Sequence, residues 1–278
     1  TGIDAARAQP AGLWPDTILI NGKLAVYEGP PAQALAVRGD TIAAIGSTQA
    51  IRALAGTSTR IIDLGGRTVI PGLIDSHIHA IRAGLGYAVE VHWFDVRTLQ
   101  EALNRLRIAA RHAPKGAWLV VAGGWTERQF REDRRPTQKE IVAAAPDHRV
   151  YIQSFYSKVL LDPLGAKALG IAGNPEWNTR LTAERNADGE LTGWLAGDNR
   201  AISDLFNRLP KPSAEQKHAG TLAFFRALNA RGITGINDPG GYNLEIDDYQ
   251  TLLQVWRERR LTLRVRYSLS APRRGYEL

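Results

Sequence analysis

Short runs of apolar residues, separated by residues typical of tight turns, fill the first quarter of the chain. Two pairs of runs have the form of β-hairpins: Asn21-Gly22, which favours a type I′ turn, separates the first pair, and Arg38-Gly39-Asp40 separates the second. The pattern predicts a small β domain over residues 16–67, after a leader or disordered segment at 1–15. The predicted strands cover residues 17–20, 24–27, 34–37, 42–46 and 60–64, with a short helix at 47–54.

After residue 80 the pattern changes to apolar runs that alternate with helical segments, which is typical of an α/β domain. Thr98, Thr137 and Ser213 each begin a capping box, the Ser/Thr-x-x-Glu/Gln pattern that starts helices. The polar stretch 174–189 predicts a loop. The predicted strands cover residues 118–122, 150–153, 233–238 and 261–267, and the predicted helices cover 98–112, 137–145, 213–231 and 247–259.

Two histidines, His77 and His79, follow two short apolar runs, Thr68-Val69-Ile70 and Leu73-Ile74. On a strand, residues i and i+2 point to the same side, so both imidazoles would project together from the C-terminal end of a buried strand. Neutral imidazole is the commonest nitrogen ligand for zinc-like ions. A bare His-x-His pair is more often a surface or core feature than a metal site, so its context decides.

That context resembles the amidohydrolase superfamily, the metal-dependent hydrolases with a (β/α)8 barrel. Residues 63–72, Asp-Leu-Gly-Gly-Arg-Thr-Val-Ile-Pro-Gly, are similar to the phrase that leads from an N-terminal β-sandwich into the barrel in urease-related members. The pair His77 and His79 then resembles the metal ligands at the end of the first barrel strand. The resemblance implies an α/β fold: a small β-sandwich over 16–67, then the first part of the barrel over 68–278.

Three phrases in the middle of the chain are similar to one branch of that family, which includes N-substituted formamide deformylase. They are Gly123-Gly124-Trp125, then Arg134-Arg135-Pro136-Thr137, then Asp-Gly-Glu-Leu-Thr-Gly-Trp-Leu at 188–195. The branch usually has an Asp-Gly-His phrase after the strand at 150–153, but residues 154–158 contain no histidine. Tyr156 or Ser157 could contact substrate there instead, and ordinary loop packing is the alternative.

A barrel of this kind needs eight strands, and about four follow the β domain. The resemblance therefore implies that residues 1–278 are the N-terminal portion of a longer protein. The family's remaining ligands would lie on later strands: a bridging acid or carboxylated lysine, two histidines and a catalytic aspartate, which is expected beyond residue 278. Residues 1–278 alone are expected to be inactive.

Several other residues are candidates for the same pocket. Asp75 shares a face with His77, where it would orient a ligand histidine or simply close the strand. Asp238 ends a strand, where barrel enzymes place active-site residues, although it also begins a good turn. His92 lies in the loop after the first strand and would line the pocket. The residues expected to form an aromatic wall, suited to an apolar or aromatic N-substituent, are Trp93, Trp125 and Tyr156.

Composition removes some classes of function. The chain has no cysteine, which excludes disulfides, thiol catalysis and cysteine-ligated zinc, and no apolar run near 18 residues, which argues against a membrane span. A net charge of +7 is compatible with nucleic-acid binding, but no aromatic-interleaved basic stripe accompanies it. Ala6-Arg7-Ala8 resembles a signal cleavage site without the segments that should precede it, so cytoplasmic and bacterial periplasmic locations both stay open.

The resemblance implies a metal-dependent hydrolase that cleaves a carbon–nitrogen bond in a small-molecule amide, outside normal peptides. One or two divalent ions, zinc above all, would activate a water molecule. The alternative is a non-catalytic protein with the amidohydrolase fold, or an inactive fragment. Neither a nucleic acid nor a membrane is expected as a partner, and a homo-oligomer is left open.

Overall fold

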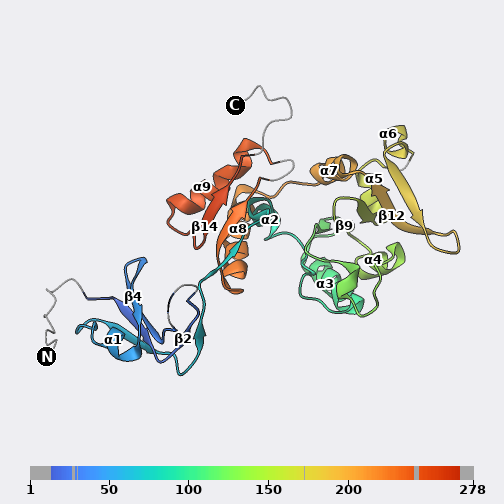
Figure 1. Cartoon of the computed structure of the whole chain (residues 1–278). Helices are drawn as coiled ribbons and strands as arrows, with labels where there is room; N and C mark the ends of the chain where they lie inside the picture. Colours follow the sequence, from blue (N-terminus) through green and yellow to red (C-terminus); the bar gives the residue numbers. More distant parts are fainter. Residues whose placement is uncertain (1–13, 27–28, 30, 172, 241–243, 270–278) are drawn as a thin grey trace, which may run out of the picture. The chain divides into compact units, whose positions relative to one another are not determined.

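A computed structural model describes residues 14–26, 29, 31–171, 173–240 and 244–269 (Figure 1). Apart from residues 14 and 15, the predicted leader lies outside the described residues, as does residue 27 at the end of a predicted strand. The chain divides into two compact units, Thr1–Leu73 and Ile74–Leu278. None of the described helices is long and apolar enough to cross a membrane.

The first unit contains two small β-sheets. One has four strands in the order β4-β3-β1-β5, and the other pairs β2 with β6. β3 and β4 form the predicted hairpin around Gly39, whose φ of 58° lies in the left-handed region. These elements are β1 (Thr17–Ile20), β2 (Lys23–Leu24), β3 (Ala34–Arg38), β4 (Thr41–Gly46), α1 (Thr48–Arg52), β5 (Arg60–Asp63) and β6 (Thr68–Val69). The sheets are the predicted β domain, and their arrangement as a sandwich stays a prediction.

The first predicted hairpin is wrong. β1 pairs with β3 and β5, and β2 pairs in parallel with β6 of the other sheet. Asn21 takes the left-handed φ of 57°, and its amide nitrogen donates to the Asp63 carboxylate at 2.9 Å. Gly22 packs so closely on the Leu64 side chain that a Cβ would collide with it. The Asn-Gly turn therefore sends the chain into a second sheet instead of folding it back.

The second unit also contains two sheets. A five-stranded sheet has the order β11-β12-β10-β9-β8, and a three-stranded sheet has the order β14-β13-β7. The pairs β8–β9 and β13–β14 are parallel, whereas β9, β10, β12 and β11 pair antiparallel. The strands are β7 (Leu73–Asp75), β8 (Trp118–Val121), β9 (Arg149–Ser154), β10 (Lys158–Leu161), β11 (Leu181–Arg185), β12 (Leu191–Gly197), β13 (Ile233–Asp238) and β14 (Arg264–Tyr267).

Two of the expected barrel strands belong to a different sheet. β8 and β9 form as predicted, but they do not neighbour β7. After β9 the chain reverses at Phe155, which has a φ of 50°, and continues through antiparallel partners that a parallel barrel does not have. β13 is the strand beside β7, and no closed barrel is formed by the described residues. This order brings the ends of β7 and β13 together, although about 160 residues separate them in sequence.

The predicted helices are confirmed, and all three capping boxes are present at their N-termini. The loop predicted at 174–189 is wrong, because this stretch forms α6 and β11 around Trp177, which is 1% exposed. The helices are α2 (Ala80–Gly86), α3 (Leu99–His112), α4 (Gln138–Ala144), α5 (Pro163–Ala168), α6 (Pro175–Asn178), α7 (Asn199–Asn207), α8 (Ala214–Asn229) and α9 (Gln250–Arg257), with short 3-10 turns at Glu127–Gln129 and Ile246–Tyr249.

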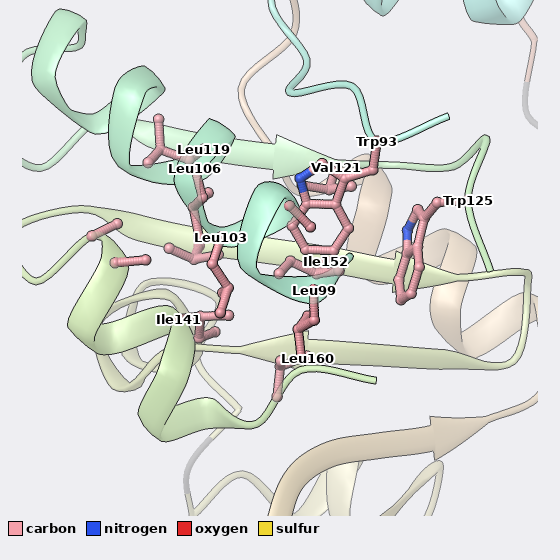
Figure 2. Close-up of a cluster of buried hydrophobic side chains, with 14 of the residues drawn as sticks. Trp93, Leu99, Leu103, Leu106, Leu119, Val121, Trp125, Ile141, Ile152 and Leu160 are labelled. Atoms are coloured by element: carbon pink, nitrogen blue, oxygen red, sulfur yellow. The ribbon is translucent and has the colours of Figure 1, made fainter. Parts of the chain in front are cut away.

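A large apolar core joins α3 and α4 to the five-stranded sheet. Figure 2 shows Leu99, Leu103 and Leu106, from one face of α3, packed over strand residues such as Ile152 and Leu160. Burying each such side chain contributes about 1.5–3 kcal/mol. A second core joins α2, α8 and α9 to β13. The residues that follow β7 are therefore tied to the rest of the second unit through α2.

Candidate active site

The two histidines lie just after β7, not on it. β7 ends at Asp75, whose carboxylate accepts a hydrogen bond from the backbone N–H of His77 at 3.0 Å and so turns the chain. His79 is the N-cap residue of α2. The ring centroids of His77 and His79 are 5.4 Å apart, with an angle of 85° between the ring planes. A turn, and not the pleat of a strand, therefore keeps the two imidazoles together.

The expectation of a buried strand before the histidines is also wrong for the described residues. The side chains of Leu73 and Ile74 are 49% and 73% exposed. β7 lies at the edge of its sheet with β13 as its only neighbour among the described strands, so one flank of β7 is uncovered.

β13 holds the turn that carries the histidines. Asn237 accepts a hydrogen bond from the backbone N–H of Ile78 through its carbonyl oxygen, and its side-chain amide donates to the carbonyl of Ser76; both distances are 3.2 Å. The fully buried Asp238 accepts from the backbone N–H of Ile81 at 2.8 Å and from that of Gly240 at 3.0 Å. Asp238 therefore ties the first turn of α2 to the end of β13.

His79 has one ring nitrogen that the protein does not satisfy. Its Nδ1 atom is buried and has no hydrogen-bond partner. The nearest acid is Asp238, whose Oδ1 lies 4.0 Å away, which is too far for a hydrogen bond. An unsatisfied buried imidazole nitrogen is costly unless a ligand or a small shift of the ring pairs it. Asp75 supports the turn through His77 but is not among the partners of either imidazole ring.

The pair has the donor chemistry for a divalent ion of the zinc type, which neutral imidazole nitrogens bind well. Within the described part of the chain, no group of three His, Cys, Asp or Glu side chains converges to hold a metal. His77 and His79 could therefore serve as two ligands of a divalent ion, and a complete metal shell needs at least one more. Asp238 lies 4.0 Å from the buried Nδ1 of His79, so a small shift of the ring would let this carboxylate accept its N–H and orient the histidine.

A cavity of about 680 Å³ opens beside His79. Its size lies within the range for small-molecule sites. Residues from α2, the strand ends of the five-stranded sheet, α7 and α8 line it. Much of the wall is aromatic; the ring-bearing residues are Tyr87, His92, Phe94, Trp125, Phe155, Tyr156, Phe206 and Phe224.

The structure places the predicted wall residues differently. Trp125 and Tyr156 line the cavity, and the indole N–H of Trp125 donates to the Gln153 carbonyl at 3.0 Å. Trp93 does not line it; that side chain is fully buried in the core, with its ring centroid 5.1 Å from that of Trp125. The large apolar area of Trp93 is better removed from water between α3 and the sheet, which corrects its expected place in the wall.

His92 lines the cavity, as expected for a pocket residue. Its Nε2 lies 2.8 Å from the carbonyl oxygen of Tyr87, and its ring stacks on the Tyr87 ring with centroids 4.2 Å apart. Burial lowers the pKa of His92, so the imidazole is neutral near pH 7. These contacts fix His92 as a wall residue that is separate from the His77–His79 pair.

Two charged residues of the wall, Arg82 and Glu90, were missed in the sequence. Burial raises the pKa of Glu90 to about 7, against a smaller lowering by Arg82. The only sequence signal for Arg82 is its position three residues after His79, in the first turn of α2. Glu90 follows in an irregular segment, and no pattern marks it.

Comparisons with known proteins agree on one family. The profile of the amidohydrolase family matches residues 60–276. The chain is 28% identical over 236 residues to Protein LONG AFTER FAR-RED 3 of Arabidopsis thaliana, covering 84% of this chain and 40% of that protein. It is 29% identical over 234 residues to an N-substituted formamide deformylase of Arthrobacter pascens, covering 80% and 42%. It thus spans about two fifths of the length of these relatives.

Among solved structures, the fold resembles an uncharacterized metal-dependent hydrolase from Pyrococcus furiosus. The TM-score is 0.58 at 17% sequence identity, and the match covers 92% of this chain and 50% of the other. At that identity the likeness concerns the fold alone.

Proposed function

The chain belongs to the amidohydrolase family, and from that premise we propose that the protein hydrolyses a carbon–nitrogen bond of a small-molecule amide at a metal held in part by His77 and His79. One of its relatives is named N-substituted formamide deformylase. The proposed substrate is accordingly an amide outside a normal peptide, with N-substituted formamides as its first examples.

One observation carries the proposal. Two imidazoles with centroids 5.4 Å apart stand at the start of α2, and one of them, His79, lines a 680 Å³ cavity. When bound, one or two divalent ions, of which zinc is the first choice, would lower the pKa of a water molecule toward neutrality and polarise a carbonyl oxygen.

The residues of this chain have positioning and binding roles in the proposal. Asp238 and Asp75 hold the turn that presents the histidines, through the hydrogen bonds to Ile81 and His77. Trp125 and Tyr156 offer aromatic faces to an apolar N-substituent in the cavity. No residue of the cavity wall is assigned proton transfer at the scissile bond.

The test uses the full-length protein with His77→Asn and His79→Asn, and with His112→Asn as a matched control on the exposed C-terminal turn of α3. Metal content by elemental analysis and hydrolysis of N-benzylformamide are both measured. We expect both histidine variants to lose most of the bound metal and the activity, and the control to keep both. Wild-type protein that binds less than about one ion per chain, and cleaves no amide, would instead favour a non-catalytic member of the family.

A further inference from the structure

Arg82 and His79 line the same cavity. Arg82 lies in the first turn of α2, three residues after His79, which is the N-cap residue of that helix. Arg82 is half-buried and lines the 680 Å³ cavity together with His79. A group bound to Arg82 would therefore be within the length of one small molecule from the histidine pair.

The Arg82 guanidinium has an aromatic neighbour, whereas no described residue offers it a hydrogen-bond acceptor. Its Cζ atom lies 4.7 Å from the centroid of the Phe206 ring on α7, a cation–π contact across the cavity. Within the described residues, no hydrogen bond or ion pair engages its five N–H donors. Arg105 differs: it donates to the Asp95 carboxylate at 2.6 Å. Arg180, similarly, donates to Asp204 at 2.7 Å.

Among the described residues, no acid of the cavity wall forms an ion pair with Arg82. Glu90 folds against Gly86 at the far end of α2, and the charge of Arg82 only partly offsets the rise of its pKa. Burial raises the pKa of Glu90 to about 7, so a large fraction of it is uncharged near neutral pH. Asp248 already pairs with Lys217 at 3.0 Å, and Lys211 adds a further cation. The cations of the cavity wall therefore outnumber its charged acids, and no described residue accepts a hydrogen bond from the Arg82 guanidinium.

We propose that Arg82 binds a carboxylate of the substrate, so that the protein acts on amides that carry a carboxylate close to the scissile bond. The planar guanidinium matches a carboxylate with two parallel hydrogen bonds, and its contact with Phe206 holds that plane before the ligand arrives. The aromatic wall would take the apolar part of the same molecule. N-formyl and N-acyl derivatives of aromatic amino acids have this combination of groups. The hydrolysis of such amides rests on the proposed function, whereas the binding of a carboxylate by Arg82 does not.

Binding is tested first, without turnover. The probes are 3-phenylpropionate and 3-phenylpropanamide, which differ in the carboxylate alone, and their affinities for the full-length protein are measured by calorimetry. We expect the carboxylate to bind about 10–100-fold more tightly than the amide. Arg82→Met should abolish this preference, Arg82→Lys should retain part of it, and Arg226→Met, on the exposed face of α8, should leave it unchanged. A preference that survives Arg82→Met, or none in the wild type, overturns the proposal.

Turnover is tested with N-formylphenylalanine and N-phenethylformamide, a second pair that differs by one carboxylate. Arg82→Met should raise KM about 10–100-fold for the acid, with little change in KM for the neutral amide or in kcat for either. An equal loss of kcat/KM for both substrates would mean that Arg82 has a structural role, and the proposal fails.

If the wild type cleaves neither substrate, the proposed function fails, and the binding experiment still decides whether Arg82 binds a carboxylate. A misfolded Arg82→Met protein would lose neutral-probe binding too, and Arg82→Lys then decides.

Discussion

The two sheets of the second unit bury their strands to very different extents. In the five-stranded sheet, Val150, Tyr151 and Ile152 of β9 are all fully buried. In the three-stranded sheet, Leu73 and Ile74 of β7 are about half or more exposed, although β7 leads directly to the histidine pair. The first sheet covers its own apolar surface with α3, α4 and antiparallel neighbours. The second leaves apolar side chains open beside the candidate site.

This difference separates the stability of the unit from its chemistry. The five-stranded sheet contributes Gln153 of β9 and Tyr156 of the turn between β9 and β10 to one wall of the cavity. The three-stranded sheet contributes the turn with His79 and the acid that holds it, Asp238. A change in the first region should therefore alter folding, and a change in the second should alter the site with less effect on folding.

The largest expected effect compares the same substitution in both sheets. Ile152→Ala opens a cavity in the packed core and should destabilise the protein by about 2–5 kcal/mol. Ile74→Ala, at a side chain 73% exposed, should cost about 0.5 kcal/mol or less. Urea denaturation followed by tryptophan fluorescence measures both. Equal costs would break the comparison and show that the Ile74 side chain is covered in solution.

Replacing Asp238 should affect both stability and metal binding. Asp238→Ala leaves the buried N–H of Ile81 without its acceptor, which costs about 1–3 kcal/mol. If Asp238 also orients His79, zinc affinity should fall about 10–100-fold. Isothermal titration with zinc and urea denaturation give the two numbers. Asp238→Asn keeps one acceptor oxygen, so its stability and zinc affinity should lie between those of the wild type and Asp238→Ala. If Asp238→Ala loses stability but keeps its zinc affinity, the role of Asp238 is limited to holding α2.

Sequence patterns predicted the elements better than their partners. The capping boxes at Thr98, Thr137 and Ser213 fixed helix starts because each box is a local exchange of hydrogen bonds. The strand at 150–153 was also predicted, but not its sheet. An apolar run of four to six residues fits a parallel barrel and a mixed sheet equally, since both bury it on two faces.

In the candidate site too, local features could be predicted from the sequence, whereas contacts between distant segments could not. The pair His77 and His79 could be found by its spacing, although a turn holds it where a strand was expected. The role of Asp238 in fixing α2 depends on β13 lying beside β7, which no local pattern encodes. Arg82 could not be singled out from the sequence, because an arginine on a helix is ordinary; only the fold shows that it lines the cavity and that no described residue accepts a hydrogen bond from it.

The helix ends should be equivalent in the two regions even though the strands are not. Thr98 caps α3 beside the five-stranded sheet, and Ser213 caps α8 beside the three-stranded sheet, each with a complete box. Thr98→Ala and Ser213→Ala should each cost about 1 kcal/mol, since one N-terminal N–H loses its acceptor in both. Denaturant midpoints measure the two costs. A much smaller loss of stability for Ser213→Ala would mean that the N-terminus of α8 frays locally. The difference between the two regions would then hold for their helices as well as for their strands.

The smallest expected effect is a pH dependence confined to the first region. The side-chain hydrogen bonds from Arg134 lower the pKa of Glu140, on α4, to about 2 from the 4.5 of an unperturbed glutamate. Because the folded-state pKa is depressed, the stabilisation is complete above about pH 4.5 and is lost as the pH falls toward 2. Arg134 is 48% exposed, so solvent screening reduces the stabilisation by this ion pair to about 1 kcal/mol or less.

Glu140→Gln should therefore destabilise the protein at pH 6 but hardly at pH 2.5. In a protein that already carries Arg134→Gln, the cost of Glu140→Gln at pH 6 should be smaller. A pH-independent cost would assign the effect of Glu140 to its capping of Thr137, a contact that glutamine can also make.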